Sequence, residues 1–184
     1  MSRHFAVQAT KISNDFMSFL SKCNQTCSWG SYRFDKGLHL MDFFNLVMID
    51  WDPSPSDTPD EVHYTISSIE DVDRILSNRI KSNPDEFWVT YLTPSGGVHA
   101  FLVSHKYTPE EAEPLMRELK CDLLYVELSL KRKKFGVRIS PKPNRLGDYV
   151  ASFWKTFGGG VPLMEHLETL KLKESYIKGA KYLS

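Results

Sequence analysis

The sequence has no apolar segment long enough to cross a bilayer, and Arg3 and His4 interrupt any apolar run that could act as a signal peptide. It also has few cysteines, three in 184 residues, and an odd number cannot all pair as a secreted fold would require. These absences argue against a membrane-spanning protein and a disulfide-rich secreted protein. We therefore predict a soluble, intracellular, cytoplasmic protein with reduced thiols and no membrane contact.

The sequence also has too few ligands for a closed zinc site. Cys23 and Cys27 could supply two ligands, but a structural zinc site takes about four. Cys121 and His63 are the remaining candidates, and nothing in their spacing supports them. The sequence therefore favours unligated thiols over a zinc centre.

Net charge is absent as well, because 23 Lys and Arg residues balance 23 Asp and Glu residues. Such a chain does not coat nucleic acid by bulk electrostatics. The charges are nevertheless segregated: residues 37–73 contain nine acids and no Lys or Arg, whereas residues 128–147 contain seven Lys or Arg and no acid. This separation favours a site with metal cations on one wall and anionic phosphates on the other, although unbalanced faces also arise by chance.

Length and composition predict one domain over residues 1–184, because a chain of this size with 41% hydrophobic residues can bury one sizeable core. Apolar runs alternate with helical patterns, which predicts an α+β fold with a mixed or antiparallel sheet flanked by helices. The expected helices begin at about residue 13 and at about residue 108, and cover 68–81, 148–157 and 162–178. The expected strands cover 38–41, 43–49, 87–92, 98–103, 123–130 and 135–139.

Local signals mark several of these boundaries. Ser67 with Glu70, and Thr108 with Glu111, have the spacing of capping boxes, in which a hydroxyl and a carboxylate satisfy free backbone N–H groups at a helix start. Pro114 should kink or restart the second helix. The glycines of the 93–97 segment permit a turn, which makes the strands on either side a β-hairpin.

Asp50 and Asp52 end an apolar strand just before a cluster of prolines. Strand side chains alternate with period two, so both carboxylates point to the same face. Two hard oxygen ligands can hold Mg²⁺ or Mn²⁺ there, and a third acid would permit two ions around a phosphoryl-transfer centre. The alternative is a pair of solvated acids at the edge of a loop.

His99 follows the 93–97 turn on the next strand of the hairpin. There its imidazole could donate to a phosphate while the turn amides approach closely, and Ser95 lies in the same turn. A lone hairpin histidine more often has neither role.

The third acid is predicted to be Glu127, which falls in the expected 123–130 strand, with Asp122, just before that strand, as the alternative. Beyond it, Arg138 and Lys142 offer donors for a triphosphate, since the planar guanidinium suits phosphate oxygens. Predicted nucleic-acid contacts come from the basic turn and the segment after it: Lys131, Arg132, Lys133, Lys134 and Arg145. An ordinary solvated turn would have the same composition.

Taken in order, these motifs resemble those of the archaeo-eukaryotic primase superfamily, over residues 46–145. The resemblance implies an RRM-like catalytic core in which Asp50 and Asp52 match the two metal ligands of the family's DxD motif. It also implies that Ser95 and His99 match the SxH motif, allowing for variable glycine spacing, with the histidine contacting the nucleotide's phosphates.

Two positions depart from that family pattern. Glu127 stands where the family has Asp, and residues 138–142 only approximate its basic strand. The chain also has little room for the helical or zinc modules that many primases carry.

The sequence therefore predicts a template-directed nucleotidyltransferase of the primase or primase-polymerase type, a DNA primase. It would use Mg²⁺ or Mn²⁺, nucleoside triphosphates and a single-stranded template or primer-template, with a helicase or other replication proteins as further partners. Two alternatives stay open: a noncatalytic single-strand-binding replication accessory module, and a metal-dependent nuclease, because the same carboxylates can activate water.

Overall fold

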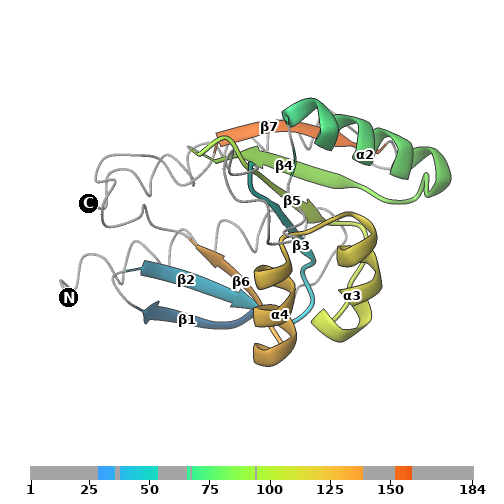
Figure 1. Cartoon of the computed structure of the whole chain (residues 1–184). Helices are drawn as coiled ribbons and strands as arrows, with labels where there is room; N and C mark the ends of the chain where they lie inside the picture. The colour runs from blue at the N-terminus through green and yellow to red at the C-terminus, as the bar shows by residue number, and fades with distance from the viewer. Residues whose placement is uncertain are drawn as a thin grey trace.

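A computed structural model describes residues 29–35, 38–53, 66, 68–93, 95–138 and 152–158 (Figure 1). Along the part of the chain covered by these ranges there are seven strands and three helices. The strands are β1 (Trp29–Asp35), β2 (Leu38–Phe43), β3 (Met48–Trp51), β4 (Trp88–Leu92), β5 (Val98–Leu102), β6 (Phe135–Arg138) and β7 (Ser152–Phe157). The helices are α2 (Ile69–Ser82), α3 (Pro109–Glu118) and α4 (Leu123–Arg132). None of these helices is long and apolar enough to span a membrane.

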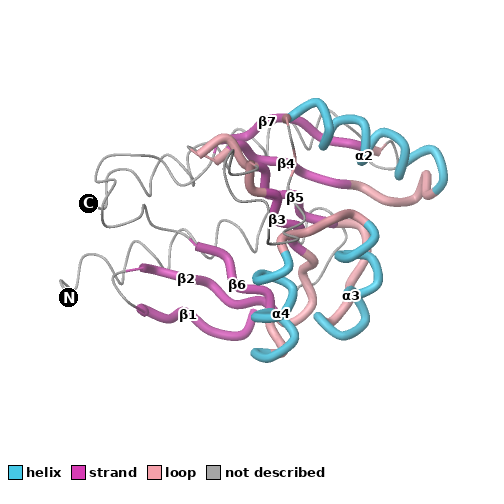
Figure 2. The backbone as a smooth tube through the Cα atoms, viewed as in Figure 1, coloured by secondary structure: helices cyan, strands magenta, loops and turns pink. Residues whose placement is uncertain are grey.

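The strands form two antiparallel sheets. One has the order β1-β2-β6 and the other has the order β3-β5-β4-β7. In Figure 2 the three-stranded sheet lies below the four-stranded sheet, and α4 lies beside β6 and next to α3. The predicted α+β class with antiparallel pairing is confirmed.

The main core lies on one face of the four-stranded sheet. Trp51 and Trp88 are fully buried there, and Val72 and Leu76 of α2 pack against the same cluster. α2 is also tied to β7 by an ion pair between Lys155 and Asp73. Because apolar side chains on one strand face are committed to this core, the alternate positions are left for a site.

The predicted β-hairpin is confirmed as β4 and β5, paired from Trp88 opposite Leu102 to Leu92 opposite Val98. Its turn closes with the Gly97 carbonyl accepting from the Thr93 amide at 2.9 Å. Gly96 has a φ of 87°, a backbone conformation that glycine adopts without the steric cost that other residues would have.

The helix predictions for α2 and α3 are also confirmed, with small shifts. The capping partners of α2 are Ser68 and Asp71, one residue after the predicted pair, whereas Thr108 and Glu111 cap α3 as expected. Pro114 lies inside α3, and no restart interrupts the helix.

The predicted strand over 123–130 is wrong, because this segment is helix α4. Asp122 acts as the N-cap, and its carboxylate accepts from the Tyr125 amide at 2.8 Å. Lys133 then ends the helix in the left-handed conformation with a φ of 53°. The apolar residues of this segment suggested a strand, but the capped start and the burial of Val126 and Ser129 at helical spacing favour a helix.

The predicted helix over 148–157 is wrong for its described part, since Ser152–Phe157 is β7, which pairs with β4. β1 was not predicted at all, although aromatic residues recur in its sequence. The expected helices from about residue 13 and over 162–178 lie outside the described residues.

Candidate active site

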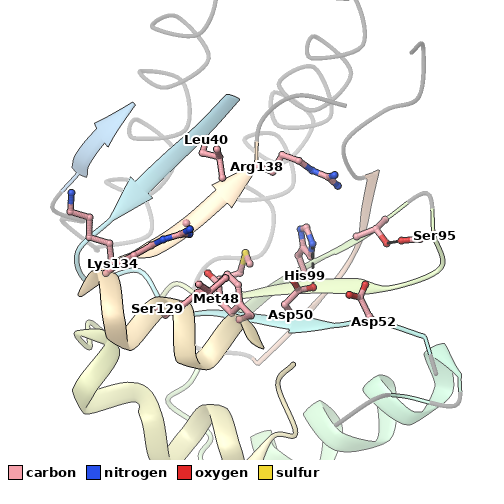
Figure 3. Close-up of a pocket in the computed structure, with 14 residues that line it drawn as sticks. Leu40, Met48, Asp50, Asp52, Ser95, His99, Ser129, Lys134 and Arg138 are labelled. Atoms are coloured by element: carbon pink, nitrogen blue, oxygen red, sulfur yellow. Dashed lines mark hydrogen bonds and ion pairs between the residues drawn. The ribbon is translucent and has the colours of Figure 1, made fainter. Parts of the chain in front are cut away.

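A pocket of about 400 Å³ opens between the two sheets, which is within the usual size range of small-molecule sites (Figure 3). Strands of both sheets and helix α4 contribute to its wall. Its lining residues are Leu40, Met48, Asp50, Asp52, Thr93, Ser95, His99, Tyr125, Leu128, Ser129, Arg132, Lys134, Gly136 and Arg138.

The acidic wall comes from β3. Asp50 lies between the fully buried Ile49 and Trp51, so its side chain points away from the core and into the pocket. Asp52 follows directly after the strand and lines the same pocket, as Figure 3 shows. The expectation that the two carboxylates share one face at a strand end is confirmed.

The segment between α3 and α4 fixes the backbone of this wall. The Asp50 amide donates to Cys121 Sγ at 3.3 Å, and the Asp50 carbonyl accepts from the Asp122 amide at 2.8 Å. The indole Nε1 of Trp51 donates to the Leu119 carbonyl at 2.7 Å. The segment 119–122 thus satisfies hydrogen-bonding groups on the edge of β3 that would otherwise be unpaired.

Cys121 is fully buried, and burial strongly raises the pKa of its thiol. It therefore stays neutral at physiological pH and serves as a weak acceptor for the backbone rather than as a nucleophile.

His99 lies directly opposite Asp50 in the β3–β5 register, and its Nε2 is 3.4 Å from Asp50 Oδ1. Its side chain is 12% exposed, and burial together with the nearby Arg138 lowers its pKa to about 4. The Asp50 carboxylate favours the protonated form, but desolvation and the guanidinium outweigh it. At pH 7 the imidazole is therefore neutral, with one N–H available to donate.

The hairpin turn brings Ser95 and the backbone close to Asp52. The Gly97 amide donates to Thr93 Oγ1 at 2.9 Å, and that oxygen lies 3.0 Å from Ser95 Oγ. A Cβ on Gly97 would lie 2.5 Å from the Trp51 carbonyl oxygen and 3.1 Å from Asp52 Oδ1. Glycine at this position is what lets the turn approach the acidic wall.

The basic wall lies across the pocket from the acids. Arg132 is in the last turn of α4, Lys134 follows that helix, and Arg138 ends the described part of β6. In Figure 3 the Arg138 side chain extends above His99, and Lys134 lies at the opposite end of the pocket from Ser95. The charge segregation in the sequence is thus reproduced as two facing walls.

Not every predicted site residue joins this group. Glu127 lies on α4 with its side chain 62% exposed, paired with Arg117 at 3.0 Å, and it does not line the pocket. Lys131 and Lys133 are exposed and do not line it either, whereas Arg132 and Lys134 do. The remaining two predicted residues, Lys142 and Arg145, lie outside the described residues.

The lining residues that the sequence prediction missed include two hydroxyl-bearing residues of α4, Tyr125 and Ser129. They were not recognised as site residues because residues 123–130 were expected to form a strand. Had the N-cap at Asp122 been recognised, the spacing of four residues would have placed both on one helix face.

A divalent ion fits the acidic wall. Mg²⁺ is usually held by one or two carboxylates together with substrate phosphates and water, and Asp50 and Asp52 supply that number. Across the ranges that the structure describes, no group of three or more His, Cys, Asp or Glu is arranged to hold a metal. The chemistry of the pair therefore fits an ion that shares its coordination with a phosphate ligand.

Comparison with family models, curated proteins and solved structures found no match to this chain.

Proposed function

We propose that this chain is a template-directed nucleotidyltransferase of the primase or primase-polymerase type, with an RRM-like primase catalytic core. One observation carries the proposal. Asp50, Asp52 and His99 on one wall face Arg132, Lys134 and Arg138 on the other, across a single pocket of suitable size. Carboxylates for a divalent ion opposite cations for phosphates are what binding of a metal–triphosphate complex requires.

In this proposal each residue has a defined task. Asp50 and Asp52 hold Mg²⁺ or Mn²⁺, which, when bound, neutralises phosphate charge and favours ionisation of the attacking hydroxyl. Neutral His99 donates its N–H to a phosphate oxygen, and Arg138 offers two parallel donors to the same group. Ser95 and the turn amides approach the phosphates from the hairpin side.

The reaction is the transfer of a nucleotidyl group to a strand. The 3′-hydroxyl oxygen of the strand forms a bond to the α-phosphorus, the bond from that phosphorus to its bridging oxygen breaks, and pyrophosphate leaves. The hydroxyl proton passes to water, since an imidazole with a pKa near 4 is a poor base at neutral pH.

The test is primer extension on a single-stranded template with Mn²⁺ and nucleoside triphosphates. The double variant Asp50→Asn with Asp52→Asn should lose at least about 100-fold in rate, corresponding to about 3 kcal/mol of lost transition-state stabilisation. Asp85→Asn is the matched control, because Asp85 is an exposed acid paired with His105 outside the pocket. Undiminished synthesis by the double variant would reject the proposal.

The same assay separates the two alternatives. An accessory module would bind single strands without needing a divalent ion and would form no product. A nuclease would shorten a labelled strand in a metal-dependent reaction that requires the same carboxylates. The module gains some support from the position of Glu127, which leaves two acids in the described pocket wall.

A further inference from the structure

Helix α4 presents a row of polar groups to the pocket. Tyr125, Ser129 and Arg132 are separated by four and three residues, which places them on one face of the helix, and all three line the pocket. The two hydroxyls have no part in the metal or triphosphate contacts proposed above, and Arg132 belongs to the basic wall without an assigned phosphate contact, so the purpose of this row has to be sought separately.

The two hydroxyls in this row are buried, and no described residue is their hydrogen-bond partner. Ser129 is 2% exposed, and within the described ranges neither its Oγ nor the Tyr125 Oη is hydrogen-bonded. The two hydroxyls are close neighbours, and burial raises the pKa of Tyr125 well above its usual value. Neither oxygen, however, reaches hydrogen-bonding geometry with the other.

Such a pair is unusual, because most buried side-chain hydroxyls in proteins have a partner. An unpaired buried hydroxyl costs stability, and a chain that needed only packing here would do better with Phe and Ala. Two of them side by side in a pocket wall are explained if a ligand supplies the missing partner.

The surroundings indicate what kind of ligand this is. In Figure 3, Ser129 lies beside Met48 toward the Lys134 end of the pocket, away from Ser95 and Asp52. Apolar side chains of Leu40, Met48 and Leu128 line the pocket together with the cations. Hydroxyls, a guanidinium and apolar surface in one row suit a sugar joined to a phosphate.

The position of Tyr125 orients that sugar. Tyr125 lies in the first turn of α4, whose N-cap Asp122 donates its amide to the Asp50 carbonyl at 2.8 Å, so the start of the row lies next to the acidic wall. Arg132 lies two turns further along α4, at the other end of the row.

We infer that the Tyr125–Ser129–Arg132 face of α4 binds the terminal sugar-phosphate of the strand being extended, with the sugar hydroxyl beside Tyr125 and Asp50 and the phosphate at Arg132. This inference rests on the proposed function, and it adds a binding site for the acceptor strand that is separate from the triphosphate contacts at Ser95, His99 and Arg138.

The experiment measures binding, with no turnover. A fluorescent single strand is displaced from the full chain, in Mg²⁺ and without nucleoside triphosphate, by a short strand ending in a 3′-hydroxyl or by the same strand ending in a 3′-deoxy sugar. The wild type should prefer the 3′-hydroxyl strand by about threefold to tenfold, the range of one hydrogen bond. Tyr125→Phe and Ser129→Ala should each reduce that preference. Arg132→Gln should weaken both strands equally.

Matched controls come from outside the pocket: Tyr107→Phe, Ser82→Ala and Arg74→Gln. These variants should keep the wild-type preference and affinity. The urea midpoints of Tyr125→Phe and Ser129→Ala should be unchanged or higher, because no existing hydrogen bond is lost. A fall in midpoint would show that the hydroxyls are structural and would overturn the inference.

Equal affinity of the wild type for the two strands, or no strand binding, would also overturn it. If the 3′-hydroxyl preference holds but the Asp50 and Asp52 double variant still synthesises, the proposed reaction fails while the strand site remains. If synthesis depends on the carboxylates but the preference is missing, the reaction stands and this subsite is rejected.

Discussion

At the scale of single residues, His99 is a buried histidine of the pocket wall whose pKa is strongly lowered by burial and by the nearby Arg138. Its pKa of about 4 lies below the ordinary value of 6.5, so between these pH values the unfolded chain takes up a proton that the folded chain does not. We therefore predict that stability falls as pH drops from about 6.5 to 4, by up to about 3 kcal/mol from this residue.

The measurement is urea unfolding across that pH range in EDTA, so that metal binding does not interfere. His99→Gln should show a flatter profile between pH 6.5 and 4, because the group responsible is gone. His105→Gln is the control, since His105 is more exposed, at 30%, and has no comparable burial. A wild-type slope retained in His99→Gln would contradict the assignment.

Gly97 and Gly96 are neighbouring glycines with different tasks, and they permit a matched comparison. We predict that Gly97→Ala costs about 1–3 kcal/mol of stability, because its Cβ would press on the Trp51 carbonyl, and that it also displaces Asp52. Gly96→Ala should cost about 1–2 kcal/mol through its positive φ alone, since its Cβ would meet open space.

Urea unfolding and Mn²⁺-dependent extension distinguish the two. Both variants should lose stability, but only Gly97→Ala should lose synthesis well beyond its unfolded fraction. Equal activity of the two variants at a temperature where both are folded would refute the link between the turn and the acidic wall.

At the scale of elements, residues 119–122 hydrogen-bond the edge strand β3, and the burial of Cys121 in this segment permits a test of how firmly it is held. Cys121 is fully buried and its raised pKa leaves almost no thiolate, so both access and reactivity are low. We predict that in the Cys23→Ser, Cys27→Ser variant, iodoacetamide labels Cys121 no faster than the protein unfolds. Mass spectrometry over time in zero and moderate urea checks this prediction. Rapid labelling in the absence of urea would mean that the segment opens locally.

Elements with strong local signals were predictable from the sequence. The β4–β5 hairpin and the α2 and α3 helices follow from turn glycines and capping residues, and Asp50, Asp52, Ser95 and His99 reach one pocket because they belong to β3 and this hairpin. Such signals act within a few residues, so reading them needs no knowledge of the tertiary structure.

Where local signals conflict, tertiary packing decides. The segment after Asp122 is as rich in apolar residues as a buried strand, but contact with α3 and the buried Val126 and Ser129 favour a helix. Because this segment was predicted to be a strand, Glu127 was included in the expected site, and Tyr125 and Ser129 were not. β7 was missed for a similar reason, because its pairing partner β4 lies about 65 residues earlier in the chain.

At the scale of the whole molecule, the two sheets divide the charged groups between them. The four-stranded sheet provides the acids and His99, whereas Arg138 comes from the three-stranded sheet and Arg132 from α4. Binding of a strand and binding of a triphosphate should therefore respond to different variants.

We predict that Arg132→Gln lowers the slope of log affinity for single strands against log salt by about 0.7, the value for one phosphate contact, without changing affinity for a metal–triphosphate complex. Arg138→Gln should weaken binding of the metal–triphosphate complex and leave the salt slope for single strands unchanged. Titrations at several salt concentrations, with Arg74→Gln as the neutral comparison, check both expectations. Identical effects of the two variants on both ligands would mean that the cations form one undivided patch.

The pocket between the sheets has a mechanical consequence. A nucleotide that touches Asp50 on one side and Arg138 on the other connects residues of the two sheets across the pocket. A nucleotide bound in the pocket should therefore hold the two sheets together. Its binding should slow amide hydrogen exchange in both β6 and β3, although these strands are not paired with each other. An inhibitor that filled only one side would lack this effect, so exchange rates in β6 would show whether a compound spans the whole site.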